Sequence, residues 1–309
     1  MSDFDYGTLG TAEQRRDYYR EQGYVVVPSL LSRRDCSAVI DAFRCEVKPF
    51  EGHIYRQASA NPEEHKWTPA GTMLNSILNP VAVNPRQFPR FRDLVTRMLA
   101  SDALFGAASE LYDEAAGLVQ SMYFEGNPAT WAHQDCYYLD STREGDLMGA
   151  WLALEDIDPR SGQFYVMPGS HRLDLLPNEG ATSIAYNHDA YKQHVLDQIE
   201  THGLEKRSPR LNAGDVLFWG SRVIHGADEP VSHEYSRNSL TAHFIPLSSD
   251  FLQYQKRIRV IEYDQVGGNM VSRPKDQAQL KNRLMLGIEA RLPGPFQWLK
   301  RRAVAAALR

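Results

Sequence analysis

A run of short apolar segments separated by turn residues occupies the middle of the chain, from Gly117 to about residue 247. This run limits most strongly what the sequence can fold into. The candidate strands are 118–124, 147–155, 163–167, 215–219, 222–225 and 239–246. Turn signals such as Gly126-Asn127-Pro128 and Pro168-Gly169-Ser170 lie between them. Many short strands with such turns are typical of a sandwich or a barrel, so we expect a mainly β fold.

Helical patterns flank this β region on its N-terminal side. The expected elements there are helices over 11–22, 32–47 and 89–115, with a short strand over 24–28. Gly23 is a usual C-terminal helix signal, and Ser32 is a good N-terminal cap. Residues 50–85 read as irregular. No linker or repeat divides the chain, so we expect one domain over 1–309, with a helical support (11–115) beside a barrel core (117–247).

Two further segments extend the predicted barrel. A polar helix is expected over 188–207, and long inserts of this kind often form lids or substrate walls. The stretch 275–309 reads as a helical, amphipathic extension whose end, 294–309, is basic. Such an end can contact an anionic membrane surface, or it can belong to a helix packed on the domain with a solvated basic face.

Composition excludes several classes of protein. The net charge of -5, from 34 basic and 39 acidic residues, argues against a nucleic-acid-binding protein. The three cysteines form no CxxC pair, which suggests reduced thiols and a cytoplasmic protein. No apolar run approaches the roughly 20 residues that span a bilayer. Contact with the inner face of the membrane through the basic tail is the open alternative.

The chemistry is expected at His133 and Asp135, which are joined by His225 ninety residues later. Positions i and i+2 of a strand share one face, so the first two side chains point the same way. Two histidines and one carboxylate are the protein ligands of mononuclear non-haem iron, with positions left open for a cosubstrate and oxygen. Arg237 follows and is suited to bind a carboxylate through two parallel hydrogen bonds.

Several segments in the same order resemble the phytanoyl-CoA dioxygenase family of iron(II)/2-oxoglutarate oxygenases. The matching segments are 23–28, Trp131-Ala132-His133-Gln134-Asp135, 150–156, 162–171, Ala213-Gly214-Asp215, and His225-Gly226 leading to Arg237. The resemblance covers roughly residues 14–247. It implies a double-stranded β-helix, the jelly-roll or cupin-like barrel, with helices packed along one side.

The resemblance also implies residue roles. His133, Asp135 and His225 fall on the iron-ligand positions, and Arg237 falls on the position that binds the C5 carboxylate of 2-oxoglutarate. Ser239 can add a hydroxyl to the same carboxylate. Gln120, Trp151 and Tyr138 are further candidates for cosubstrate or substrate contacts, and they can equally be residues that fill the barrel. Related halogenases replace the carboxylate ligand by a small residue, so Asp135 favours hydroxylation.

The predicted activity is therefore an iron(II)- and 2-oxoglutarate-dependent hydroxylation that consumes O2 and releases succinate and CO2. Acyl-CoA, natural products and lipid-linked sugars all remain open as the small-molecule substrate. Desaturation or rearrangement at the same centre is one alternative. A non-catalytic jelly-roll sensor and a zinc hydrolase on a cupin barrel are the others; the latter leaves Arg237 unexplained.

Overall fold

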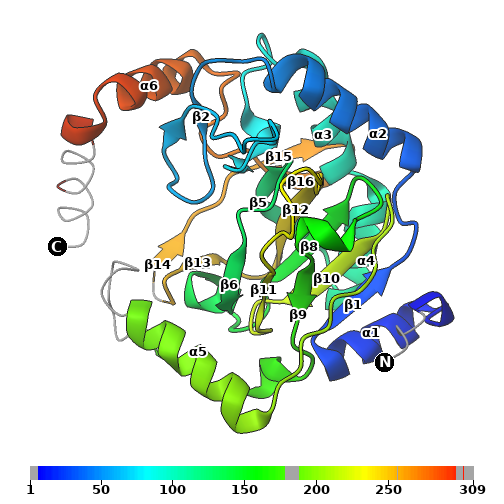
Figure 1. Cartoon of the computed structure of the whole chain (residues 1–309). Coiled ribbons are helices and arrows are strands. Elements are labelled where there is room, and N and C mark those ends of the chain that lie inside the picture. The colour runs from blue at the N-terminus through cyan, green and yellow to red at the C-terminus, as the bar shows by residue number, and fades with distance from the viewer. Residues whose placement is uncertain (1–5, 178–187, 256, 297–301, 303–309) are drawn as a thin grey trace.

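A twisted sheet that is almost entirely antiparallel forms the centre of the fold (Figure 1). The computed structural model describes residues 6–177, 188–255, 257–296 and 302. This large sheet has the order β1 (Tyr24–Val27), β10 (Val216–Gly220), β8 (Met148–Ala153), β12 (Ser239–Pro246), β5 (Ala116–Phe124), β16 (Asn269–Ser272) and β15 (Tyr263–Val266), with β4 (Ile77–Leu78) also beside β5. The β16–β5 pair is parallel.

A second, smaller sheet completes the barrel. Its order is β6 (Thr130–His133), β11 (His225–Ala227) and β9 (Phe164–Val166). A cluster of buried side chains from both sheets, including Trp151, Leu217, Val166 and Val223, fills the space between them. The predicted fold class, a double-stranded β-helix with flanking helices, is confirmed.

The two faces of the large sheet have different neighbours because side chains alternate along a strand. On β12, Leu240, Ala242 and Phe244 belong to the core shared with the helices. Ser239 and His243 point to the other face, into the barrel, and both are buried. The helices packed on the outer face are α2 (Arg33–Ala42, continued by a π-helical turn over Phe43–Val47), α3 (Pro89–Leu99) and α4 (Asp102–Tyr112).

Two expected elements differ from the structure. The helix expected over 89–115 is two helices, because Ala100 ends α3 and the Ser101 hydroxyl accepts a hydrogen bond from the Leu104 backbone to cap α4. The strand expected over 222–225 begins only at His225, because a turn closed by a hydrogen bond from the Val223 amide to the Gly220 carbonyl precedes it.

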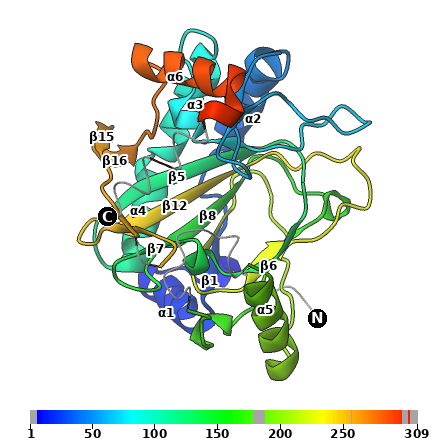
Figure 2. The same cartoon turned by 90° about the vertical axis from the view of Figure 1, so that its left-hand side faces the viewer.

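The remaining elements lie around the barrel. They are α1 (Ala12–Gln22), α5 (His188–His202), α6 (Leu280–Arg291), the β2–β3 pair (Ile54–Tyr55, Pro62–Glu63) and the small sheet β14–β13–β7 (Arg257–Arg259, Phe251–Gln253, Leu139–Ser141). Helices α5 and α6 lie at opposite ends of the molecule in both views (Figures 1 and 2).

No helix among the described residues is long and apolar enough to cross a membrane. The expected 294–309 tail lies mostly outside the described residues, and the one-domain organisation stays a prediction.

Candidate metal centre

Three side chains, two from paired strands and one from the turn that follows the first of these strands, converge inside the barrel. His133 ends β6 and stands directly opposite His225 of β11 in the strand register. Asp135 starts a short 3-10 turn just after β6. The ligand atoms of the three residues all lie within 4.8 Å of one another. Asp135 carboxylate oxygens lie 3.7 Å from His133 Nε2 and 3.6 Å from His225 Nε2.

Both imidazoles are oriented by backbone carbonyls. His133 Nδ1 donates to the Trp131 carbonyl, and His225 Nδ1 donates to the Val223 carbonyl, each at 2.9 Å. A carbonyl can only accept, so each proton resides on Nδ1 and the Nε2 lone pair is free to bind a metal. Burial lowers the pKa of His225 to about 4, which keeps this ring neutral at pH 7.

Asp135 is held as an ionised carboxylate. Burial alone would raise its pKa, but the positive charge that His225 and His243 carry when protonated, and hydrogen bonds from His133 and His243 in that form, outweigh burial and lower the pKa well below its usual range. The indole Nε1 of Trp219 donates a further hydrogen bond to Asp135 Oδ2 at 2.9 Å.

This donor set fits an iron(II) ion. Two neutral imidazole nitrogens and one ionised carboxylate form the facial arrangement that leaves ligand positions open. Each of the three donors also has a hydrogen-bonded neighbour that fixes its orientation, as metal ligands usually do.

Arg237 is a buried cation without a carboxylate partner in the described part of the chain. It is 3% exposed, and burial lowers its pKa to about 10. One guanidinium nitrogen donates to the Gly162 carbonyl at 2.9 Å, whereas Nε has no hydrogen-bond partner among the residues that the structure describes. Arg237 forms no ion pair with any described residue. The comparably buried Arg92 binds both carboxylate oxygens of Asp276 at 2.7 and 3.0 Å. A buried guanidinium without a carboxylate partner is suited to bind the carboxylate of a ligand.

The other candidates for cosubstrate contact lie on strands of the barrel, and two of them contact Arg237. Trp151 is buried, and its ring lies 5.8 Å from the Arg237 guanidinium carbon. The Ser239 hydroxyl donates its proton to the Arg237 carbonyl at 3.2 Å, so its oxygen can still accept a hydrogen bond but has no second proton to donate. Gln120 is half-buried on β5, opposite His243 in the register.

Tyr138 is bonded to α5. Its hydroxyl lies 3.0 Å from His188 Nε2, and its ring meets His133 edge-on with 6.1 Å between centroids. Trp131 also packs edge-on against His188 and lies under the Lys192 ammonium. An aromatic wall thus joins α5 to the strand that carries His133; below, "the α5 wall" means Trp131, Tyr138, His188 and Lys192. His188 is the first residue of the helix expected over 188–207, and the structure places it in this wall.

Two residues that contact the centre were not anticipated from the sequence: Trp219 and His243. His243 Nε2 lies 3.6 Å from Asp135 Oδ2, and the His243 Nδ1 atom is buried with no hydrogen-bond partner among the described residues. The two-residue alternation along β12, from Ser239 through Thr241, places His243 inside the barrel and was the available signal.

His171 lies away from the centre, where its Nε2 contacts the Arg20 carbonyl, in keeping with the structural turn expected there.

Sequence comparison finds relatives of this chain. The sequence profile of the phytanoyl-CoA dioxygenase (PhyH) family matches residues 19–239. The chain is 21% identical over 253 residues to the peroxisomal phytanoyl-CoA dioxygenase of Bos taurus, covering 78% of this chain and 71% of that one. It is 24% identical over 256 residues to a probable phytanoyl-CoA dioxygenase of Caenorhabditis elegans, covering 77% and 76%.

Solved structures share the fold. The non-haem, α-ketoglutarate-dependent epimerase SnoN of nogalamycin biosynthesis superposes with a TM-score of 0.58 at 18% identity, covering 84% of this chain and 97% of that one. EctD from S. alaskensis with bound Fe superposes with a TM-score of 0.57 at 17% identity, covering 79% of each chain.

Proposed function

Because the chain belongs to the phytanoyl-CoA dioxygenase family and is thus a 2-oxoglutarate-dependent dioxygenase, we propose that it hydroxylates an unactivated C–H bond of a small molecule. Succinate and CO2 are the coproducts of this reaction. The observation that carries the proposal is the buried Arg237, without a carboxylate partner among the described residues, in the same barrel as His133, Asp135 and His225.

We assign the roles of these residues as follows. His133, Asp135 and His225 hold iron(II), which when bound supplies the oxidation of the C–H bond by O2. Arg237 binds the C5 carboxylate of 2-oxoglutarate, and its guanidinium is fixed by the Gly162 carbonyl and the Trp151 ring. Ser239 and Gln120 lie on neighbouring strands of the same barrel and complete the cosubstrate pocket. Buried apolar side chains around the site exclude bulk water.

The α5 wall is proposed as the substrate side of the centre. Two of its residues, Trp131 and Tyr138, adjoin His133, whereas Arg237 contacts Trp151. Trp131 and Tyr138 offer ring faces to an apolar or cyclic substrate, and His188 and Lys192 offer polar contacts at the rim. This composition suits a ring-bearing natural product at least as well as a linear acyl chain.

Rearrangement at the same centre is the second candidate reaction. The observation that favours it is that two solved structures with this fold are described as an epimerase and a carbocyclase of nogalamycin biosynthesis. Hydroxylation and rearrangement need the same iron and 2-oxoglutarate sites. The substrate that the α5 wall admits must therefore decide which reaction occurs.

The decisive test measures 2-oxoglutarate turnover. Purified protein with iron(II), 2-oxoglutarate and O2 should form succinate, slowly without substrate and faster with one from a panel of cyclic natural products. Arg237→Met should abolish succinate formation at 2-oxoglutarate concentrations that saturate the wild type. Absence of succinate across the panel would instead favour a non-catalytic binding protein, and activity with zinc in the absence of oxygen would favour a hydrolase.

A further inference from the structure

The outward face of α6 is a concentrated apolar surface. Five large side chains, four on α6 and one at the residue that caps its C-terminus, are between 45% and 61% exposed: Leu280, Leu284, Met285, Ile288 and Leu292. At about 100° per residue they fall within an arc of about 140°. They are five of the eleven large hydrophobic side chains that are exposed in the described part of the chain. Scattered exposed apolar residues need no explanation, but a contiguous helix face does.

The inner side of α6 is anchored, so this face cannot turn inward without breaking buried contacts. Glu289 is 2% exposed and accepts hydrogen bonds from the Tyr55 hydroxyl at 2.8 Å and the Lys275 ammonium at 3.3 Å. Arg283 donates to the carbonyls of Gln277 and Ala278 at 2.8 Å each. The orientation of the helix is therefore fixed by polar contacts with the body of the protein.

The charge of this part of the chain is segregated from the rest. Residues 273–309 contain nine basic and two acidic side chains, a net charge of +7, whereas residues 1–272 contain 25 basic and 37 acidic side chains, a net charge of -12. Lys281, in the apolar arc, and Arg291, which lines the cleft described below, are both exposed and form no ion pair with any described residue. Elsewhere, exposed or half-exposed arginines such as Arg33, Arg97 and Arg143 do pair with carboxylates.

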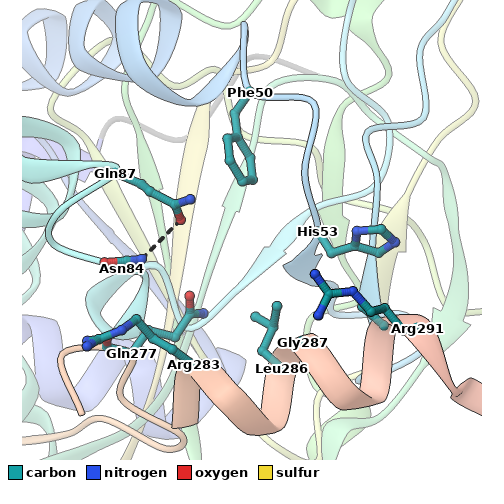
Figure 3. Close-up of a pocket in the computed structure, with 10 residues that line it drawn as sticks. Phe50, His53, Asn84, Gln87, Gln277, Arg283, Leu286, Gly287 and Arg291 are labelled. Atoms are coloured by element: carbon teal, nitrogen blue, oxygen red, sulfur yellow. Dashed lines mark hydrogen bonds between the residues drawn. The ribbon is translucent and has the colours of Figure 1, made fainter. Parts of the chain in front are cut away.

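A cleft of about 400 Å³ follows the inner edge of α6 (Figure 3). His53 and Phe50 line it from the facing loop, and Arg283 and Arg291 line it from the helix. None of its lining residues is acidic. The cleft thus offers cationic and polar groups immediately beside the apolar face, which is the arrangement that a phosphate-bearing headgroup needs next to acyl chains.

From these observations we propose that α6 docks the protein on an anionic lipid surface. Leu284, Ile288 and their apolar neighbours enter the boundary between headgroups and acyl chains, while Lys281 and Arg291 reach the lipid phosphates. The inference does not depend on the proposed reaction, because helices α6 and α5 lie at opposite ends of the molecule (Figure 2). It makes the helix itself a membrane contact.

Cosedimentation of the full chain with vesicles tests the proposal. Vesicles of phosphatidylcholine with roughly a third phosphatidylglycerol should bind the protein, vesicles of phosphatidylcholine alone should bind it far less, and added salt should weaken binding. Leu284→Glu with Ile288→Glu should reduce the bound fraction at least about tenfold, and so should Lys281→Glu with Arg291→Glu. The matched control, Val231→Glu with Val260→Glu, changes two side chains that are 80% and 86% exposed elsewhere and should bind as the wild type does.

Equal melting temperatures of all variants would show that the fold is retained. Absence of binding to the anionic vesicles would overturn the proposal, as would equal loss of binding in the control. A wild-type dimer in the absence of lipid that Leu284→Glu with Ile288→Glu converts to monomer, with no vesicle binding, would assign the face to a second copy of the chain instead. Succinate formation in solution should be unchanged in every variant, which separates this test from that of the reaction.

Discussion

The indole of Trp219 donates a hydrogen bond to Asp135 Oδ2 at 2.9 Å, so a residue of the large sheet orients a candidate metal ligand of the turn after β6. Trp219→Phe keeps the apolar ring but removes the donor. We expect the affinity for iron(II) to fall about 10- to 100-fold, as it does when such supporting hydrogen bonds are removed. Anaerobic titration with iron(II), or with Mn(II) as a spectroscopic substitute, measures the change.

Trp67→Phe is the matched control, because Trp67 is 44% exposed and its ring lies beside His65 and Lys48, not beside the three ligands. Its metal affinity should equal that of the wild type. If the Trp219→Phe variant binds iron(II) as tightly as the wild type, Asp135 is positioned without the indole.

The missing partner of Arg237 gives a prediction about 2-oxoglutarate itself. Arg237→Met removes the buried cation, so the melting temperature of the protein without ligand should stay the same or rise, because an unpaired buried charge costs stability. The stabilisation produced by adding 2-oxoglutarate should disappear, since a ligand stabilises only the state that binds it. Thermal unfolding with and without 2-oxoglutarate measures both effects. A cosubstrate-dependent shift that survives would mean that another residue binds the carboxylate.

Arg92 provides the opposite case in the same chain. Its guanidinium is buried and paired with both oxygens of Asp276, so Arg92→Met leaves a half-buried carboxylate without its partner. We expect the free energy of unfolding to fall by about 3 kcal/mol. The remaining folded protein should still be stabilised by 2-oxoglutarate. Chemical denaturation of the two variants side by side would separate structural from cosubstrate-binding arginines.

Sequence patterns predicted those parts of the centre that follow a strand period or a spacing rule. The i, i+2 pair His133 and Asp135 and the position of Arg237 near the start of a strand could be read from the chain alone. Trp219 and His243 could not be assigned to the centre in the same way. Their contacts with Asp135 depend on how β10 and β12 pair with β8 across the large sheet, which local sequence does not specify.

The elements outside the barrel also divide into those that local sequence signals specify and those that depend on packing. Gly23 and the caps of α1 and α2 are local signals, and the structure places these helices where the signals indicated. The break at Ala100–Ser101 was missed because the apolar spacing continues through it, even though Ser101 is itself a capping residue. The role of the predicted 188–207 helix became specific only when packing placed His188 against Tyr138.

The Tyr138–His188 hydrogen bond predicts a pH-dependent attachment of α5. The Tyr138 hydroxyl donates to His188 Nε2 only while the imidazole is neutral, and burial lowers the pKa of His188 below its usual value. A histidine with a lowered folded-state pKa contributes stability at neutral pH and loses it as pH falls through the ordinary histidine range, about 6.5. Amide exchange in α5, corrected for its intrinsic rate, should therefore accelerate between pH 7.5 and about pH 5.5 in the wild type.

Tyr138→Phe and His188→Ala should each give faster α5 exchange at pH 7.5 and remove most of this pH dependence. The double variant should resemble either single one, because both substitutions delete the same hydrogen bond. His202→Ala, at the far end of the same helix, is the control and should leave the pH response intact. Additive effects of Tyr138→Phe and His188→Ala would mean that the two residues hold α5 independently, and the α5 wall would then not act as one unit on the substrate side of the centre.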